Sequence, residues 1–153
     1  MKSSAKLLKI LIFILSIFSL CYFIFYLSNG LGLSYNDSRS HLDIGRRVVE
    51  GLKPGLAQIG SVWLPLPHLL MVPTIWNDFM WHTGLAGAVV SMISFVATNI
   101  LIFKFLDRLN VSMLGRILGM AIFSLNLNVL YLQSTAMTEL LLMATMMAGS
   151  YYL

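Results

Sequence analysis

The side chains best suited to chemistry lie in one polar stretch, YNDSRSHLDIGRRVVEG, which covers residues 35–51. Asp37 and His41 are four residues apart, so a helix would place them on the same side, where an acid and an imidazole can form a hydrogen-bonded pair. Arg39 and Arg46 carry guanidinium groups, whose paired N–H donors suit phosphate oxygens. The stretch therefore favours a site for proton transfer with phosphate binding nearby.

Each of these residues also has a simpler interpretation. Asp37 follows the first apolar segment directly and is suited to cap a helix N-terminus. His41 is equally an ordinary polar side chain at a membrane surface. The arginines can contact lipid headgroups or form ion pairs with Asp43 or Glu50.

Glu139 is the second acidic candidate, because it is the only charged residue between Arg116 and the end of the chain. An ionisable group at the boundary of an apolar segment is costly and suggests a function, although Thr138-Glu139 can also simply start a helix. There is no P-loop, dinucleotide-binding glycine pattern, HExxH motif or clustered cysteine and histidine set with metal spacing.

The elements that must position these residues are membrane helices. Hydrophobic residues make up 58% of the 153-residue chain and charged residues only 10%, and residues 10–36, 83–103 and 117–138 carry no charge. Runs of this length suit transmembrane helices, so we expect an all-α polytopic fold with spans at about 7–29, 83–105 and 114–133. A fourth apolar segment, 139–153, is too short to cross. We therefore expect residues 1–153 to be the N-terminal part of a longer domain, inactive by itself.

The basic residues predict the orientation. Lys2, Lys6 and Lys9 precede the first span, and Lys104, Arg108 and Arg116 surround the link between the second and third, so both regions are expected in the cytoplasm. The loop of about 35–82 then lies outside, with a short turn at 133–135 on the same side. The loop is expected to form interfacial helices at about 38–50 and from Pro65 or Pro67 to a bend or end at Pro73. The first of these is expected to have Asp37 or Ser38 as its N-cap and an apolar side of Leu42, Val48, Val49 and Leu52. All three tryptophans, Trp63, Trp76 and Trp81, lie there, which favours contact with membrane lipids. The basic residues are scattered and do not form the basic cluster that is typical of a nucleic-acid-binding surface.

Three motifs, YNDSRSHLDIGRRVVEG, PGLAQIGSVWLPLPHLLMVP and AMTELLLMA, follow the first span in this order. Together they resemble the N-terminal part of bacterial family 39 type glycosyltransferases of the GT-C class, which are similar to protein O-mannosyltransferases and lipid A aminoarabinose transferases. The resemblance covers about residues 35–142. Its most specific part is the WLPLPH block, which ends at His68, together with the preceding Asp and His-x-x-x-x-Arg pattern.

The resemblance implies an enzyme that transfers a sugar from a polyprenyl-phosphate donor to a protein, lipid or glycan acceptor, at the outer face of a prokaryotic plasma membrane. By motif, Asp37 is the catalytic acid and Glu139 a second acid or a metal or phosphate site, although Leu140 replaces the usual proline. Arg39, Arg46, His41 and His68 would bind the donor phosphate or support the site. The cofactor is left open, a divalent cation such as magnesium or manganese being the candidate.

The rival function is a transporter or a non-enzymatic membrane scaffold. Transport sites usually lie near the bilayer midplane on broken helices. The two acids here are expected at the outer edge of the membrane, which favours the enzyme.

Overall fold

The computed structural model of the chain describes residues 2–59 and 63–153, with side chains from residue 6 onward. Residues 60–62 of the second motif and the Lys2 side chain therefore lie outside the described residues. The described chain is all-α, as expected. Its helices are α1 (Lys2–Ser28), α2 (Asn36–Val49), the 3-10 helix η1 (Leu56–Gln58), α3 (Pro65–Ile75), α4 (Asp78–His82), α5 (Leu85–Arg108), α6 (Met113–Ser124), α7 (Leu127–Gln133) and α8 (Glu139–Tyr152).

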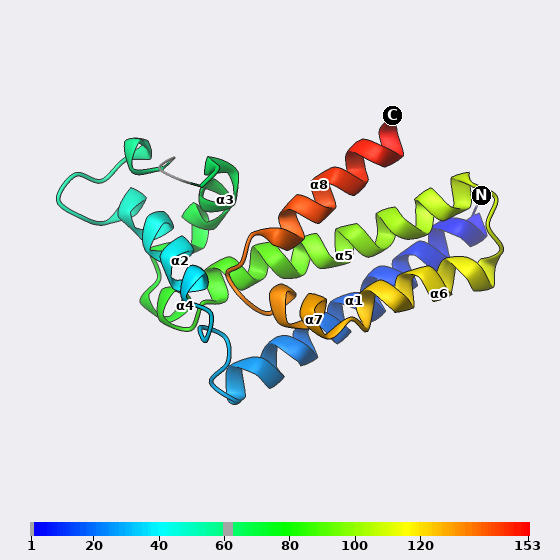
Figure 1. Cartoon of the computed structure of the whole chain (residues 1–153), viewed down its shortest axis with the longest axis horizontal. Helices are drawn as coiled ribbons and strands as arrows, with labels where there is room; N and C mark the ends of the chain where they lie inside the picture. Colours follow the sequence, from blue (N-terminus) through cyan, green and yellow to red (C-terminus); the bar gives the residue numbers. More distant parts are fainter. Residues whose placement is uncertain (1, 60–62) are drawn as a thin grey trace.

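Two helices, α1 and α5, are long and apolar enough to cross a membrane, and the bent pair of α6 and α7 counts as a third if it forms one span. Helix α5 is central: α1, α6 and α8 all pack along it (Figure 1). The main core combines buried side chains from every one of these helices, namely Leu15, Phe95, Phe103, Met120, Val129 and Leu140. Helix α8 has 14 residues, so at 1.5 Å per residue it is shorter than the hydrocarbon layer.

The predicted third span at 114–133 is not one continuous helix. It breaks after Ser124, and α6 and α7 meet at an angle of 67°. The cause is local, because the Asn126 side chain accepts hydrogen bonds from the backbone N–H groups of Asn128 and Val129 and starts a new helix. The break turns α7 toward the outer loop, where it contributes to the candidate site.

The short turn predicted at residues 133–135 is also present, but it is buried. Its position depends on Gly87 of α5, where an added Cβ would lie 2.3 Å from the Ala136 Cβ. The Ser91 hydroxyl donates a 2.9 Å hydrogen bond to the Met137 carbonyl from the same side of α5. The segment that leads to Glu139 is therefore fixed against α5.

The outer loop folds into α2, η1, α3 and α4. Helix α2 packs on α3 through Leu42, which lies in one cluster with Met71 and Ile75. Of the apolar side predicted for this helix, Leu42 and Val48 are buried, whereas Val49 and Leu52 are 37% and 104% exposed. The inward face instead includes His41.

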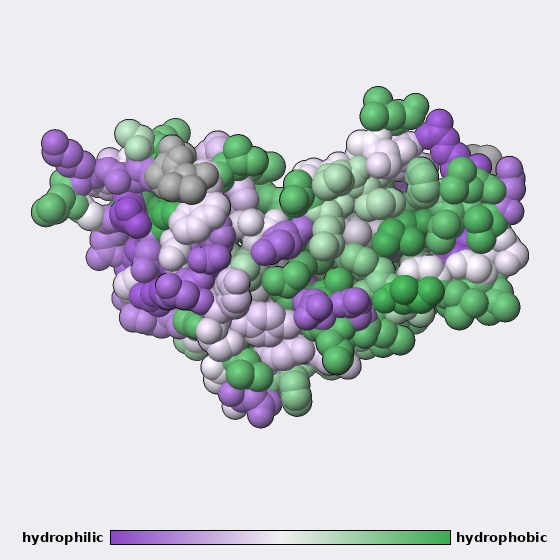
Figure 2. Space-filling view, in the orientation of Figure 1, coloured by the Kyte–Doolittle hydropathy of each residue, from purple (hydrophilic) through white to green (hydrophobic). Residues whose placement is uncertain are grey.

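Two details of the loop differ from the prediction. Tyr35, not Asp37 or Ser38, is the N-cap of α2, because its extended backbone (φ −95°, ψ 122°) precedes a helix that already includes Asp37 in its first turn. Of the two outcomes predicted at Pro73, a bend or an end, the end is wrong, because α3 continues to Ile75. In Figure 2, hydrophilic residues gather at the end of the molecule that carries α2, η1 and α4, and hydrophobic residues cover much of the remaining face.

Candidate functional site

Asp37 and Glu139 line the same cavity, which has a volume of about 500 Å³. Asp37 comes from the first turn of α2, and Glu139 is the first residue of α8. The other lining residues are Tyr35, Asn128, Tyr131, Leu132 and Met137. The fold thus brings together two carboxylates that are far apart in the sequence.

One oxygen of the Glu139 carboxylate is free to bind a partner. Its Oε2 atom is buried and has no hydrogen-bond partner. A buried carboxylate oxygen without a donor is costly, so this atom is best satisfied by water, a cation or a hydroxyl group. The start of α8 partly offsets that cost, because the helix dipole favours a negative charge at its N-terminus.

His41 does not hydrogen-bond to Asp37, which was the pairing that their spacing suggested. Its Nδ1 atom lies 3.0 Å from Nε2 of His68 in α3, and both histidines are buried. The Trp63 ring packs on the His41 ring, with 4.7 Å between centroids. The packing of α2 on α3 therefore decides the partner of His41, and helix spacing alone does not.

The two histidines have different electrostatic surroundings. Burial lowers the pKa of His41, while the charges of Asp37 and Glu139 act in the opposite direction. Burial also lowers the pKa of His68, and the charge of His41 lowers it further. The Leu64 backbone raises the pKa of His68, yet the His68 Nδ1 atom has no partner with hydrogen-bond geometry. Both imidazoles are thus biased toward the neutral form.

The two arginines proposed for phosphate lie elsewhere. Arg46 donates to the carbonyls of Ile75 and Trp76 at 2.9 and 2.8 Å and to Asp78 Oδ1 at 2.6 Å. It also pairs with Glu50. Its donors are occupied in joining α2 to the end of α3 and the start of α4, so its position supports a structural role rather than phosphate binding.

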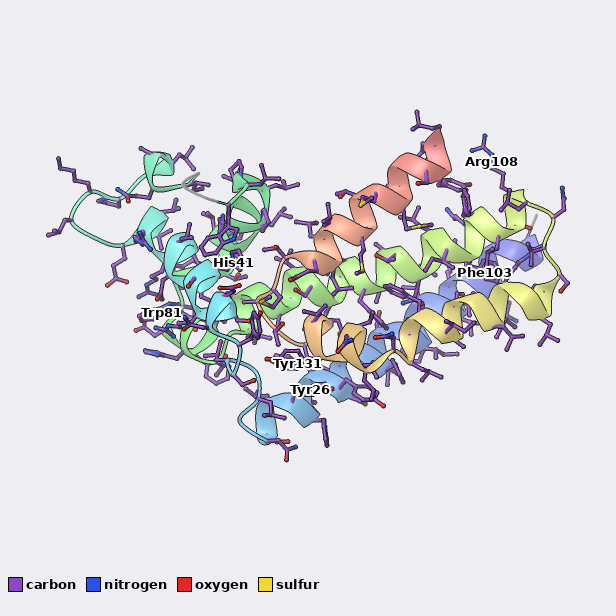
Figure 3. All side chains as sticks on the ribbon, viewed as in Figure 1. Tyr26, His41, Trp81, Phe103, Arg108 and Tyr131 are labelled. Atoms are coloured by element: carbon purple, nitrogen blue, oxygen red, sulfur yellow. The ribbon has the colours of Figure 1, made fainter. Side chains whose placement is uncertain are left out.

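Arg39 is close to that cluster. It forms a 3.2 Å salt bridge with Asp43, and its guanidinium lies 4.4 Å from the centroid of the Trp81 ring. Trp81 also donates a 3.1 Å hydrogen bond to Asp43 and stacks with Arg46 at 4.9 Å. The alternative of ion pairs with Asp43 and Glu50 is the arrangement observed. Figure 3 shows Trp81 next to α2 at the outer-loop end of the molecule.

Helix α7 also lines the cavity, which no sequence pattern predicted. Tyr131 forms a 2.8 Å hydrogen bond with Ser34 and packs edge-on against Tyr26 of α1, with 5.4 Å between centroids (Figure 3). Asn128 faces the cavity one turn earlier. The signal that could have revealed this geometry was Asn126, an N-cap residue inside an apolar run.

An apolar groove of about 210 Å³ lies close to the acids. Trp63, Leu66 and Pro67 form one wall, and Thr138, Leu141 and Leu142 of the α8 region form the other. Thr138 immediately precedes Glu139, so the groove begins next to the acidic cavity. Such a groove suits an apolar chain better than a polar ligand.

No protein-family model, curated protein or solved structure matches the chain. Among the described residues, no group of three or more histidine, cysteine, aspartate or glutamate side chains is arranged to hold a metal ion. The class that the fold defines is thus an all-α protein with two or three helices able to cross a membrane.

Proposed function

We propose that the chain carries the acidic part of the active site of a membrane glycosyltransferase. The donor is a polyprenyl-phosphate sugar, and the acceptor is a hydroxyl of a protein, lipid or glycan at the outer face of the membrane. The observation that carries the proposal is the shared cavity of Asp37 and Glu139. These are the two acids that the resemblance to family 39 type glycosyltransferases selects, and it selects them without reference to the fold.

The chemistry is a single displacement at the anomeric carbon. The acceptor oxygen forms a bond to that carbon as the bond to the phosphate oxygen breaks. Asp37 takes the acceptor's proton as general base, and the lipid phosphate leaves with the electron pair. Asp37 suits this role because it makes no cap interaction that would occupy its carboxylate.

The charge of the site bears on how the phosphate is held. The described lining of the cavity contains two acids and no lysine or arginine. A phosphate in this cavity would be repelled unless a cation accompanied it. Glu139 offers the hard oxygen ligands that Mg²⁺ or Mn²⁺ prefers, and such an ion commonly completes its shell with water and substrate phosphate. When bound, it would neutralise charge on the leaving phosphate.

The apolar groove is the observation that favours a lipid-linked donor. One of its walls includes Thr138, the residue before Glu139, and its lining is mainly leucine, proline and tryptophan. A polyprenyl chain in this groove would place its phosphate near the acids. This geometry favours a lipid-linked donor over a water-soluble nucleotide sugar.

The test compares variants of the protein expressed from its complete gene, in membranes, with a labelled polyprenyl-phosphate sugar. Asp37→Asn should lower turnover by about 10²-fold or more, the usual contribution of a positioned general base. Glu139→Gln should raise the apparent KM more than it lowers kcat if the acid contributes to ground-state binding. Asp107→Asn is the matched control, because this carboxylate lies at the other end of α5 and pairs with Arg116. Near-normal turnover by Asp37→Asn would refute the mechanism.

The alternative is a transporter, and the broken helix pair of α6 and α7 is the observation that favours it. A transporter would move a labelled solute into vesicles without forming a glycosidic bond. Measuring solute uptake and glycoside formation in the same vesicles distinguishes the two functions.

A further inference from the structure

A second and larger groove lies between α1, α5 and α8. Its volume is about 720 Å³, and it shares no lining residue with the acidic cavity or with the smaller apolar groove. Helices α1 and α8 each pack along α5, and the groove follows the part of α5 that lies between them. Its described lining is apolar except for the hydroxyl groups of Ser16, Ser19 and Tyr152. Such a groove suits an apolar chain.

The length of the groove matches one leaflet of a membrane. Its lining on α5 runs from Val89 to Leu101, which is about 18 Å along the helix at 1.5 Å per residue, and one leaflet of the hydrocarbon core is about 15 Å thick. Leu101 lies toward the end of the molecule where α1 begins and α5 ends (Figure 1). A single acyl chain therefore spans the groove.

Two lysines continue the groove at this end. On α1, Lys9 precedes Ser16 by seven residues, and on α5, Lys104 follows Ala97 by seven residues. Seven residues are nearly two full turns of a helix, so each lysine lies on the face of its helix that lines the groove. The apolar groove thus leads to a positively charged end.

Tyr151 connects this charged end to the wall of the groove. The Lys104 ammonium lies 5.9 Å from the centroid of the Tyr151 ring, and Arg108 donates a hydrogen bond to the Tyr151 carbonyl. The Tyr151 ring also packs edge-on against Tyr152, which lines the groove, with 4.9 Å between centroids. Figure 3 shows Arg108 at this end of the molecule.

The charge at this end is largely uncompensated. Its described charged side chains are Lys6, Lys9, Lys104, Asp107, Arg108 and Arg116. The one carboxylate among them, Asp107, pairs with Arg116. The other four cations form no salt bridge with a described residue. An anionic headgroup is therefore the complementary ligand for the charged end of an apolar groove.

We propose that this groove binds one anionic phospholipid, whose acyl chain lies between α1, α5 and α8 and whose phosphate contacts Lys9 and Lys104. The site does not depend on the proposed transferase function. The segment that leads to Glu139 packs near the start of α5, at Gly87, whereas the lysines lie at its far end, so this lipid is distinct from a sugar donor at the acids. The orientation expected from the basic residues places the headgroup in the cytoplasmic leaflet, which carries anionic lipids.

The test uses the protein expressed from its complete gene, in phosphatidylcholine nanodiscs that contain a trace of a photoactivatable lipid. The lipid carries one diazirine-labelled acyl chain on either a phosphatidylglycerol or a phosphatidylcholine headgroup, and mass spectrometry measures the labelling of residues 93–101. The phosphatidylglycerol probe should label this segment at least about 5-fold more, the factor expected from one basic residue beside an anionic headgroup. Equal labelling by the two probes would overturn the proposal.

Substitution of the lysines tests where the headgroup binds. Lys9→Gln and Lys104→Gln should each lower labelling by the phosphatidylglycerol probe about 5-fold and leave labelling by the phosphatidylcholine probe unchanged. Lys6→Gln is the matched control, because Lys6 is also exposed near the start of α1 but lies about 80° around the helix from Ser16. An equal loss in Lys6→Gln and Lys9→Gln would show attraction to the whole charged end and no defined site.

Substitution inside the groove tests where the acyl chain lies. Ala97→Phe fills the groove, so labelling of this segment by the phosphatidylglycerol probe should fall toward the phosphatidylcholine level. Unchanged labelling would contradict an acyl chain in the groove. If another part of the protein or a second copy covers the groove, neither probe labels residues 93–101, and the proposal fails.

Discussion

Among the side chains of the outer loop, Arg46 should contribute most to holding α2 against α3 and α4, and Arg46→Lys tests this directly. The side chain is 13% exposed and reaches two other elements: it donates to the Ile75 and Trp76 carbonyls at the end of α3 and to Asp78 at the start of α4. A lysine keeps the charge but has neither the planar fork nor the stacking surface that the arginine presents to Trp81.

The magnitude follows from what is lost. A hydrogen bond from a charged donor contributes about 1.5–3 kcal/mol, and an exposed cation–π contact about 0.5–1 kcal/mol. Asp78 and Glu50 are 74% and 64% exposed, so their ion pairs with Arg46 add little. If lysine retains one carbonyl contact, Arg46→Lys should cost about 2 kcal/mol of local stability, which corresponds to about 30-fold faster opening of the loop.

Hydrogen exchange of the α2 amides, followed by mass spectrometry in nanodiscs, measures this opening. Asp78→Asn is the matched control, because it removes one exposed partner and leaves both carbonyl contacts, so exchange should change by less than about 3-fold. Equal protection from hydrogen exchange in Arg46→Lys and in the unmodified chain would refute the stabilising role of Arg46. A larger effect from Asp78→Asn would show that the ion pair, not the carbonyl contacts, carries the stability.

Three further outcomes are expected. The folded chain lowers the pKa of His41 and of His68 below the ordinary value of 6.5, so the unfolded state binds more protons at acid pH. Thermal stability should therefore fall as pH drops through about 6.5 and below, and it should fall less in His41→Gln. In a cysteine-free background, Leu52→Cys should react with an impermeant thiol reagent added to intact cells and Leu109→Cys should not; the reverse pattern would contradict the orientation. Gly87→Ala should lower turnover at least as much as Glu139→Gln, because its Cβ would collide with the segment leading to Glu139; unchanged turnover at matched expression would show that this segment moves freely.

Composition and charge distribution predicted the all-α fold and the positions of α1 and α5, because the hydrophobic effect acts on long segments and needs no tertiary detail. The break between α6 and α7 escaped this reasoning, since one side chain, Asn126, decides it within a run that is otherwise apolar. The loop helix α2 was predicted within two residues at its start. Its buried face was predicted only in part, because Val49 and Leu52 are exposed and His41 faces inward instead.

The candidate site divides in the same way. The sequence, through its family resemblance, selected Asp37 and Glu139, but only the fold places them in one cavity. Local spacing paired His41 with Asp37, and the long-range packing of α2 on α3 supplied His68 instead. Helix periodicity describes which residues share a face; it does not describe what lies opposite that face.

The two faces of α2 explain how a structural change far from the acids should reach them. Asp37 and His41 share one side of the helix by their spacing of four, while Arg39 and Asp43 share a side about 200° away, since each residue advances about 100°. The clamp through Arg46 and Trp81 therefore fixes the rotation of α2 without touching the cavity. A loosened clamp lets Asp37 turn away from Glu139, so clamp substitutions should lower kcat even though they remove no group from the cavity. Combining Arg46→Lys with Asp37→Asn should then cost less than the sum of the two single effects, because once the base is removed its misplacement has no further consequence.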